Sequence, residues 1–287
     1  MSQVGKEIRL NKFFSKGNAV IITVDHGGYF GPLPGIENIR EIVSILADTD
    51  IDGILVNIGI VPVIKDIIKK LNIIVRLDSS TSIKSNDFTE DYFIASVEDC
   101  VRYGADMCIV NVYLGCKNEN MLLKKQGEAY GMCSHYGIPL MVEVFDYKNL
   151  DFHITNNKID AKIKFEKMVN KLTLEDILFD SRVVLEKGAD LVKTYYAGDK
   201  ESHKKVVSSC PVPILIAGGP NITSDREFLE VINNSIDSGG KGVTIGRFIW
   251  HEQSNIRERI NAICKLVHDR KSIDYCLSML TDCEKIQ

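Results

Sequence analysis

The chain has 287 residues, of which 45% are apolar, so it is long enough to enclose a large hydrophobic core. Its 35 basic and 39 acidic residues give a net charge of -4 with no block of one sign, which gives no electrostatic footprint for nucleic acid or an anionic membrane. Because the N-terminus lacks a signal-peptide core and no later run is apolar for long enough to span a bilayer, we expect a cytosolic protein that acts on a small molecule.

Short apolar runs alternate with longer segments of helical period along the whole chain. The expected strands are residues 19–25, 53–58, 73–78, 107–113, 139–145, 190–196, 213–219 and 242–246. The expected helices are 35–47, 61–71, 93–103, 118–136, 173–187, 225–238 and 254–269. This alternation predicts an α/β protein with a parallel sheet, and the strand number favours a (β/α)8 TIM barrel that forms one domain over residues 1–287. A doubly wound open sheet would also alternate, but the GxGxxG fingerprint after the first strand is absent.

An insertion at about 148–171 interrupts the regular spacing. It is rich in Lys and Asn and is longer than a usual connection from a strand to a helix. Two interpretations stay open. The segment is either a surface excursion, with an extra helix at 158–170, or a lid or subunit contact at the catalytic end of the barrel.

The residues that end the strands are the first candidates for chemistry, because a barrel of this kind has its active site at the carboxyl ends of its strands. These residues are Asp25, His26, Asn57, Asp78, Tyr113, Phe145, Asp146, Lys193, Tyr195, Gly218, Gly219, Gly246 and Arg247.

The last two strands end in glycine-containing turns, "AGGP" (217–220) and "IGR" (245–247). Glycine lets backbone N–H groups approach an anion closely, and Arg247 adds charge-assisted hydrogen bonds. Many barrels bind phosphate at this place. We therefore predict a phosphate site, although two tight turns with a surface arginine would give the same pattern. The predicted site comprises Gly218, Gly219, Gly246 and Arg247.

Lys193 interrupts the apolar and aromatic strand "DLVKTYY" (190–196). Burial beside Tyr195 would favour the neutral amine, which can attack a ketone and form an iminium that accepts electrons. Asp25 would stabilise this iminium and exchange protons, and His26 would contact a substrate hydroxyl or form a turn hydrogen bond. For Lys193 the alternatives are a side chain that extends from the barrel mouth into solvent and a lysine paired to a carboxylate such as Asp25. For Asp25 the alternative is an aspartate that only shapes a turn.

Four segments carry a family resemblance over nearly the whole chain. They are "VDHGGYFGPLPGIENI" (24–39), "SSTSI" (79–83), "VKTYYAGDKESHKKVVSSCPVPILIAGGP" (192–220) and "GVTIGRFIW" (242–250). The sequence resembles the Schiff-base aldolase group that includes archaeal-type class I fructose-bisphosphate aldolase, 2-amino-3,7-dideoxy-D-threo-hept-6-ulosonate synthase and the autoinducer-2 phosphate thiolase. The resemblance implies a TIM barrel, a Schiff base on Lys193, assistance by Asp25, and phosphate binding by Gly218, Gly219, Gly246 and Arg247.

The fifth strand departs from this pattern. In the aldolase and the synthase it ends in Tyr-Pro-Arg-Gly, whose tyrosine is an acid/base, whereas Phe145 stands there in this chain. Phenylalanine cannot transfer a proton. Side chains alternate along a strand, so Tyr147 would share the inward face of Phe145 while Asp146 points away. We therefore predict Tyr147 as the catalytic acid/base. Phe248 also replaces an asparagine that follows Gly-Arg in the relatives.

These observations predict a class I aldolase or a transaldolase-type transferase. It would act on a phosphorylated ketose or related sugar through an imine on Lys193, as a homo-oligomer, with no metal or other cofactor because the iminium accepts the electrons. The alternatives are thiolase-type acyl transfer from a phosphorylated diketone, and a barrel that only binds a sugar phosphate. The main argument for a barrel that only binds a sugar phosphate is Phe145, which cannot transfer a proton.

Overall fold

Eight parallel strands close into a barrel in chain order in this computed structural model. The strands are β1 (Ala19–Thr23), β2 (Gly53–Asn57), β3 (Asn72–Arg76), β4 (Met107–Leu114), β5 (Leu140–Asp146), β6 (Leu191–Thr194), β7 (Ile214–Ala217) and β8 (Gly242–Ile245). The structure describes residues 2–68, 70–79, 81–85, 87–147, 172–218, 224–251 and 255–284. The predicted TIM barrel is confirmed, and so is each predicted strand, with small differences at the ends. The predicted insertion lies outside the described residues.

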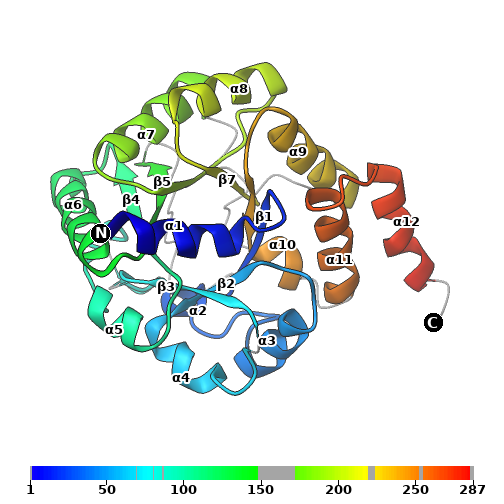
Figure 1. Cartoon of the computed structure of the whole chain (residues 1–287), viewed down its shortest axis with the longest axis horizontal. Helices are drawn as coiled ribbons and strands as arrows, with labels where there is room; N and C mark the ends of the chain where they lie inside the picture. The colour runs from blue at the N-terminus through cyan, green and yellow to red at the C-terminus, as the bar shows by residue number, and fades with distance from the viewer. Residues whose placement is uncertain are drawn as a thin grey trace.

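Helices surround the barrel, as Figure 1 shows. They are α1 (Ser2–Phe13), α2 (Gly27–Phe30), α3 (Ile39–Ala47), α4 (Val61–Ile64), α5 (Val97–Arg102), α6 (Glu119–Tyr136), α7 (Leu174–Glu186), α8 (Lys200–Ser209), α9 (Asp225–Asp237), α10 (Arg247–Trp250), α11 (Ile256–Val267) and α12 (Ile273–Glu284), with a 3-10 turn at Ile58–Ile60. The sequence did not predict α1, α2, α8, α10 or α12. Polar residues dominate in α1 and α8, so few apolar positions mark these segments as helices. None of the described helices is long and apolar enough to cross a membrane.

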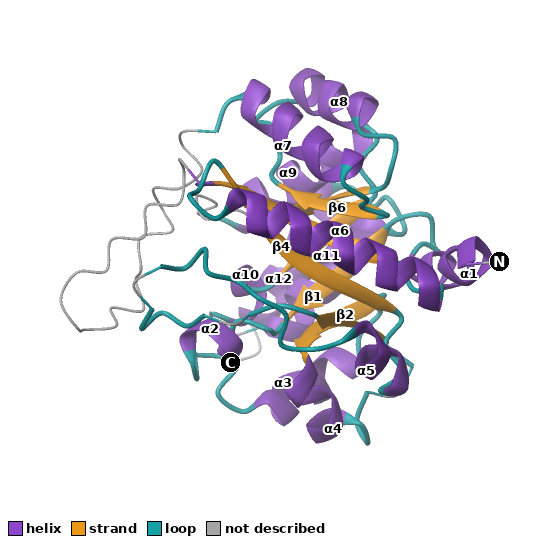
Figure 2. Cartoon of the chain, turned by 90° about the vertical axis from the view of Figure 1, so that its left-hand side faces the viewer, coloured by secondary structure: helices purple, strands orange, loops and turns teal. Residues whose placement is uncertain are grey.

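An apolar layer fills the inside of the barrel. Helix α1 lies across one end of the barrel (Figure 1), and its last residue, Phe13, is completely buried. Figure 2 shows α1 at one end of the molecule and α2 and α10 toward the other, where the strands end. The interior is thus closed at the amino ends of the strands, which leaves the carboxyl ends for a site. The layer comprises Phe13, Ala19, Ile21, Leu55, Ile74, Met107, Ile109, Met141, Leu191 and Leu215.

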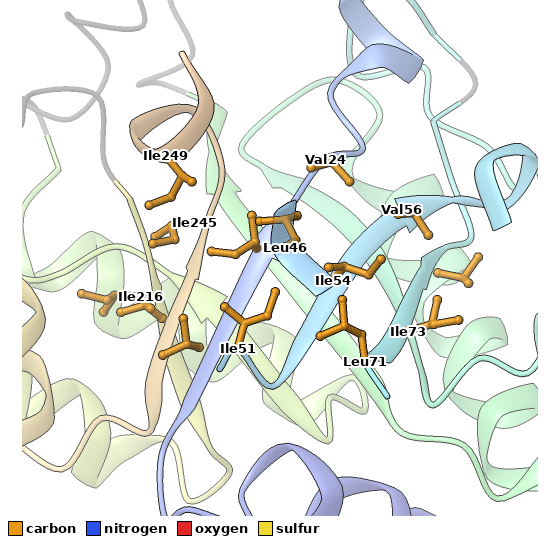
Figure 3. Close-up of a cluster of buried hydrophobic side chains, with 14 of the residues drawn as sticks. Val24, Leu46, Ile51, Ile54, Val56, Leu71, Ile73, Ile216, Ile245 and Ile249 are labelled. Carbon is orange, nitrogen blue, oxygen red and sulfur yellow. The ribbon is translucent and has the colours of Figure 1, made fainter. Parts of the chain in front are cut away.

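A second apolar core lies between the outer face of the barrel and the helices. Strand residues such as Ile54 and Ile245 pack there against helix residues such as Leu46 and Ile249, and Figure 3 shows this cluster. Each strand therefore has apolar side chains on both faces, as expected for a parallel sheet covered by helices. This arrangement holds the eight strands at fixed heights relative to one another.

Gly242 allows the barrel to close. It pairs with Ala19 where β8 meets β1, and its φ angle of 127° lies in a region that other residues rarely adopt. A Cβ atom at this position would collide with the carbonyl oxygen of Ala19. Glycine is therefore required for the last strand to pair with the first.

Candidate active site

A layer of polar side chains lies directly above the apolar interior. Strand side chains repeat every second residue, so the positions two residues beyond Ile74, Met141 and Leu191 also point into the barrel. Polar residues occupy these positions on most strands, and together they form the floor of a cavity at the carboxyl ends. The floor comprises Thr23, Arg76, Asn111, Glu143 and Lys193, together with Asp25, which follows β1.

Lys193 is buried in this layer, with 6% of its surface exposed. Its register partner on the neighbouring strand is Glu143, and the Nζ atom of Lys193 lies 2.6 Å from Oε1 of Glu143. This ion pair offsets the lost hydration of the ammonium group. The carboxylate that the sequence suggested as a partner was Asp25, whereas the one in ion-pairing contact is Glu143.

Arg76 connects Glu143 to Asp25. Its Nε atom donates to Oδ2 of Asp25 at 2.6 Å, and one terminal nitrogen donates to Oε2 of Glu143 at 2.8 Å. The other terminal nitrogen donates to Oδ1 of Asn111 at 2.7 Å and to Oδ1 of Asp78 at 3.3 Å. Arg76 is only 2% exposed. A single buried guanidinium thus holds two carboxylates at the floor of the cavity.

The electrostatic surroundings keep both carboxylates ionised. Burial alone would raise the pKa of Asp25, but Arg76 and the neighbouring His26 hold it well below its usual range. Burial would likewise raise the pKa of Glu143, yet Lys193 and Arg76 lower it overall. The pKa of His26 is lowered by burial, although its Nδ1 atom lies 3.4 Å from Oδ1 of Asp25. At neutral pH the floor therefore carries two carboxylates beside a neutral imidazole.

A second buried cation supports this cluster from outside the barrel. The Nζ atom of Lys125, on α6, lies 2.6 Å from Oδ2 of Asp78 and 3.5 Å from Oδ2 of Asp91. Asp78 also accepts a hydrogen bond from the backbone N–H of Asn111 at 2.7 Å. Asp78, one of the strand-end candidates, therefore joins β3, β4 and α6. Among the described residues, no group of three or more His, Cys, Asp or Glu side chains is arranged to hold a metal ion.

Aromatic side chains form one wall of the cavity. The amide nitrogen of Asn111 donates to the hydroxyls of Tyr29 and Tyr113, at 2.8 and 3.2 Å. Phe145 stacks on Tyr113 with ring centroids 5.2 Å apart, and it meets Tyr195 edge to face at 6.3 Å. Burial raises the pKa of all three tyrosines, so their phenols are neutral at physiological pH. Phe145 thus points into the cavity, as the alternation along β5 predicted.

The predicted phosphate residues lie at the ends of β7 and β8. Gly218, Gly246 and Arg247 all line the cavity, whereas Gly219 is outside the described residues. A Cβ atom on Gly246 would come within 2.8 Å of the carbonyl oxygen of Thr23. Glycine is therefore needed here for the end of β8 to approach β1. Phe248 packs on Phe228 with ring centroids 3.9 Å apart.

Tyr147 is placed differently from the residues above. Strand β5 ends at Asp146, so the alternation that pointed Tyr147 inward does not extend to it. Tyr147 is 41% exposed and is not among the residues that line the cavity, and Asp146 is buried. The role of Tyr147 in proton transfer stays a prediction. The sequence analysis did not identify Arg76, Asn111, Glu143 or Tyr29 as site residues. A signal was present for Arg76, Asn111 and Glu143, because each lies two residues beyond an apolar residue that points into the barrel.

The amino-acid sequence matches a known family over most of its length. Residues 19–252 match the DeoC/LacD family aldolase. The chain belongs to the DeoC/LacD aldolase family. An uncharacterized aldolase of Saccharolobus solfataricus is 31% identical, with 96% of this chain and 99% of that protein covered. The 2-amino-3,7-dideoxy-D-threo-hept-6-ulosonate synthase 1 of Archaeoglobus fulgidus is 30% identical, with 92% of this chain and 90% of that protein covered.

Solved structures agree with the fold. A crystal structure of an archaeal fructose 1,6-bisphosphate aldolase has a TM-score of 0.75 and 23% identity, and covers 91% of this chain and 99% of its own. Another archaeal fructose-1,6-bisphosphate aldolase, with its catalytic lysine bound to a carbinolamine intermediate, has a TM-score of 0.77 and 24% identity, with 91% and 98% covered. The predicted class I aldolase group and the prediction of an aldolase enzyme are confirmed by the family match.

The buried pair between Lys125 and Asp78 should contribute strongly to stability. Lys125→Met removes the cation from two buried carboxylates, and breaking such a pair costs about 3–5 kcal/mol in the free energy of unfolding. Urea unfolding at pH 7 measures this loss. The matched control is Lys124→Met, because Lys124 is 79% exposed and lies 3.8 Å from Glu128 on the surface. The control should lose less than about 1 kcal/mol. Equal losses in the two variants would contradict the structural role of Lys125.

Proposed function

We propose that the chain makes or breaks a carbon–carbon bond of a phosphorylated ketose or related sugar through a Schiff base on Lys193. The observation that carries this proposal is a buried amine at the floor of a cavity, 2.6 Å from the carboxylate of Glu143. Membership of an aldolase family supports it. We also propose that the protein is cytosolic and forms a homo-oligomer.

The imine forms in steps that the floor residues can serve. The ammonium of Lys193 first gives a proton to Glu143, whose Oε1 atom is within hydrogen-bond distance. The neutral amine then attacks the carbonyl carbon of the substrate and forms a carbinolamine. Glu143 then returns its proton to the carbinolamine hydroxyl, which leaves as water, so that the iminium remains and Glu143 is a carboxylate again. The carboxylate of Asp25 stabilises the positive charge of this iminium.

Carbon–carbon cleavage needs a base for the hydroxyl beside the breaking bond. When this hydroxyl loses its proton, it becomes a carbonyl, and the electrons of the broken bond move into the iminium and form an enamine. An aldolase then protonates the enamine, whereas a transferase lets it attack an acceptor aldehyde. Glu143 lines the cavity and is the better placed base, and Tyr147 is the candidate from the sequence. Because Glu143 can act as the base, the lack of a hydroxyl on Phe145 does not by itself imply a non-catalytic barrel.

We assign the substrate phosphate to the part of the cavity formed by the turns after β7 and β8. Gly218, Gly219 and Gly246 would offer backbone N–H groups, and Arg247 would supply a positive charge. Gly218, Gly246 and Arg247 line the same cavity as Lys193. A single substrate can therefore reach both the amine and the arginine.

Borohydride trapping tests the imine. Incubation with dihydroxyacetone phosphate, fructose 1-phosphate or fructose 1,6-bisphosphate, followed by borohydride, should leave a stable adduct that peptide mass mapping places on Lys193. Lys193→Met is the matched negative control. An adduct on another lysine, or none with any of the three compounds, would refute the Schiff-base proposal.

Two substitutions separate the candidates for proton transfer. General acid–base groups contribute on the order of 10²–10⁴ in rate. If Glu143 is the base, Glu143→Gln should reduce turnover by that range, whereas Tyr147→Phe should stay close to the unmodified enzyme. The reverse ranking would restore the role predicted for Tyr147 from the sequence. Turnover is measured by mass spectrometry of the products with and without an acceptor aldehyde, which also separates cleavage from transfer.

Arg247→Ala tests the phosphate site. Loss of a charge-assisted hydrogen bond costs about 1.5–3 kcal/mol, so KM for a phosphorylated ketose should rise roughly tenfold to a hundredfold. The effect should be absent for the same ketose without phosphate. Equal losses for both compounds would show that Arg247 supports the structure instead.

A further inference from the structure

Arg76 is the one cation of the described cavity floor other than the reacting lysine. Resting on the Schiff base proposed above, we propose that Arg76 is a positioning residue that fixes the carboxylates of Asp25 and Glu143 and thereby sets the pH range in which Lys193 forms its imine. Arg76 need not touch the substrate for this role. It acts through the two carboxylates, both of which line the cavity.

The shape of the guanidinium suits this role. Arg76 reaches Asp25 at 2.6 Å from Nε and Glu143 at 2.8 Å from a terminal nitrogen, so the two carboxylates are held by different donors of one rigid plane. The remaining terminal nitrogen donates to Asn111 at 2.7 Å and to Asp78 at 3.3 Å. A lysine offers its donors from a single nitrogen and cannot hold both carboxylates in the same geometry.

The carboxylates of Asp25 and Glu143 face two cations only when Arg76 is included. Arg76 and the ammonium of Lys193 face the carboxylates of Asp25 and Glu143, and both carboxylates have lowered pKa values. When Lys193 passes its proton to Glu143, Arg76 keeps a positive charge beside the carboxylate of Asp25. Other groups around the floor are His26 after β1, Tyr29 on α2, Asp78 after β3 with Lys125 behind it, Tyr113 on β4, Tyr195 after β6, and Arg247 after β8.

Without Arg76, the ammonium of Lys193 would be the one positive charge of the described cavity floor that compensates both Asp25 and Glu143. Uncompensated negative charge favours the ammonium form of Lys193 and so opposes the attack on the ketone. An opposite charge within about 4–6 Å changes a protonation equilibrium by roughly 1–3 pH units. The neutral amine would then appear only at higher pH.

The test follows the rate of borohydride-trapped imine as a function of pH, with dihydroxyacetone phosphate and fructose 1-phosphate as probes. In Arg76→Met, the pH of half-maximal rate should rise by about one to two units, which slows trapping at pH 7 roughly tenfold or more. At sufficiently high pH the variant should approach the unmodified rate. Arg76→Lys keeps the charge without the bridge and should shift about half as far.

Controls separate this role from a loss of structure. Circular dichroism establishes that each variant is folded, and Arg76→Lys carries the test if the methionine variant does not fold. Lys6→Met removes a buried cation that pairs with Asp190 at 2.7 Å and contacts neither Asp25 nor Glu143, and it should leave the pH of half-maximal rate nearly unchanged. A lower rate at every pH without a shift would overturn the proposal, as would an equal shift in Lys6→Met. Absence of any adduct on Lys193 in the unmodified protein would instead refute the Schiff base itself.

Discussion

The ion pair between Lys193 and Glu143 is the interaction on which the rest of the site depends. An ammonium inside a barrel loses its hydration, and only a carboxylate at the same height on a neighbouring strand can offset that loss. The carboxylate then needs a donor for its second oxygen, which Arg76 supplies. Arg76 in turn holds Asp25 with its Nε atom. One buried lysine therefore requires a connected set of charges, and removing any member leaves another without its partner.

Closure of the barrel makes this set possible. The strands lie at fixed relative heights because Gly242 lets β8 pair with β1 and because α1 closes the opposite end with Phe13. The inward positions therefore form layers, and the layer above the apolar interior is polar on several strands at once. Residues far apart in the sequence, such as Arg76 and Glu143, meet only because their strands have the same register relative to the barrel axis.

The sequence predicted features that depend on local pattern. The strands follow from apolar runs bounded by turn residues. Lys193 was found because it interrupts an apolar strand. Glu143 and Arg76 were missed because a charged residue in "MVEVF" or "IIVR" can equally face solvent when the strand order is unknown. Their partners depend on strand pairing, which a single sequence does not show. The inward orientation of Tyr147 rested on a strand that in fact ends at Asp146.

The carboxylate of Glu143 makes an electrostatic demand on the site that a tyrosine in place of Phe145 would not make. A phenol is neutral at pH 7 and needs no counter-charge, whereas a buried carboxylate does. If a carboxylate performs the proton transfer that Phe145 cannot, a second cation must accompany it, because the lysine has to become neutral before it attacks. Arg76 is that cation, and its guanidinium stays protonated throughout the reaction. The phenylalanine that first argued against catalysis is thus compatible with an active Schiff-base site in which the base and its counter-charge lie two strands apart.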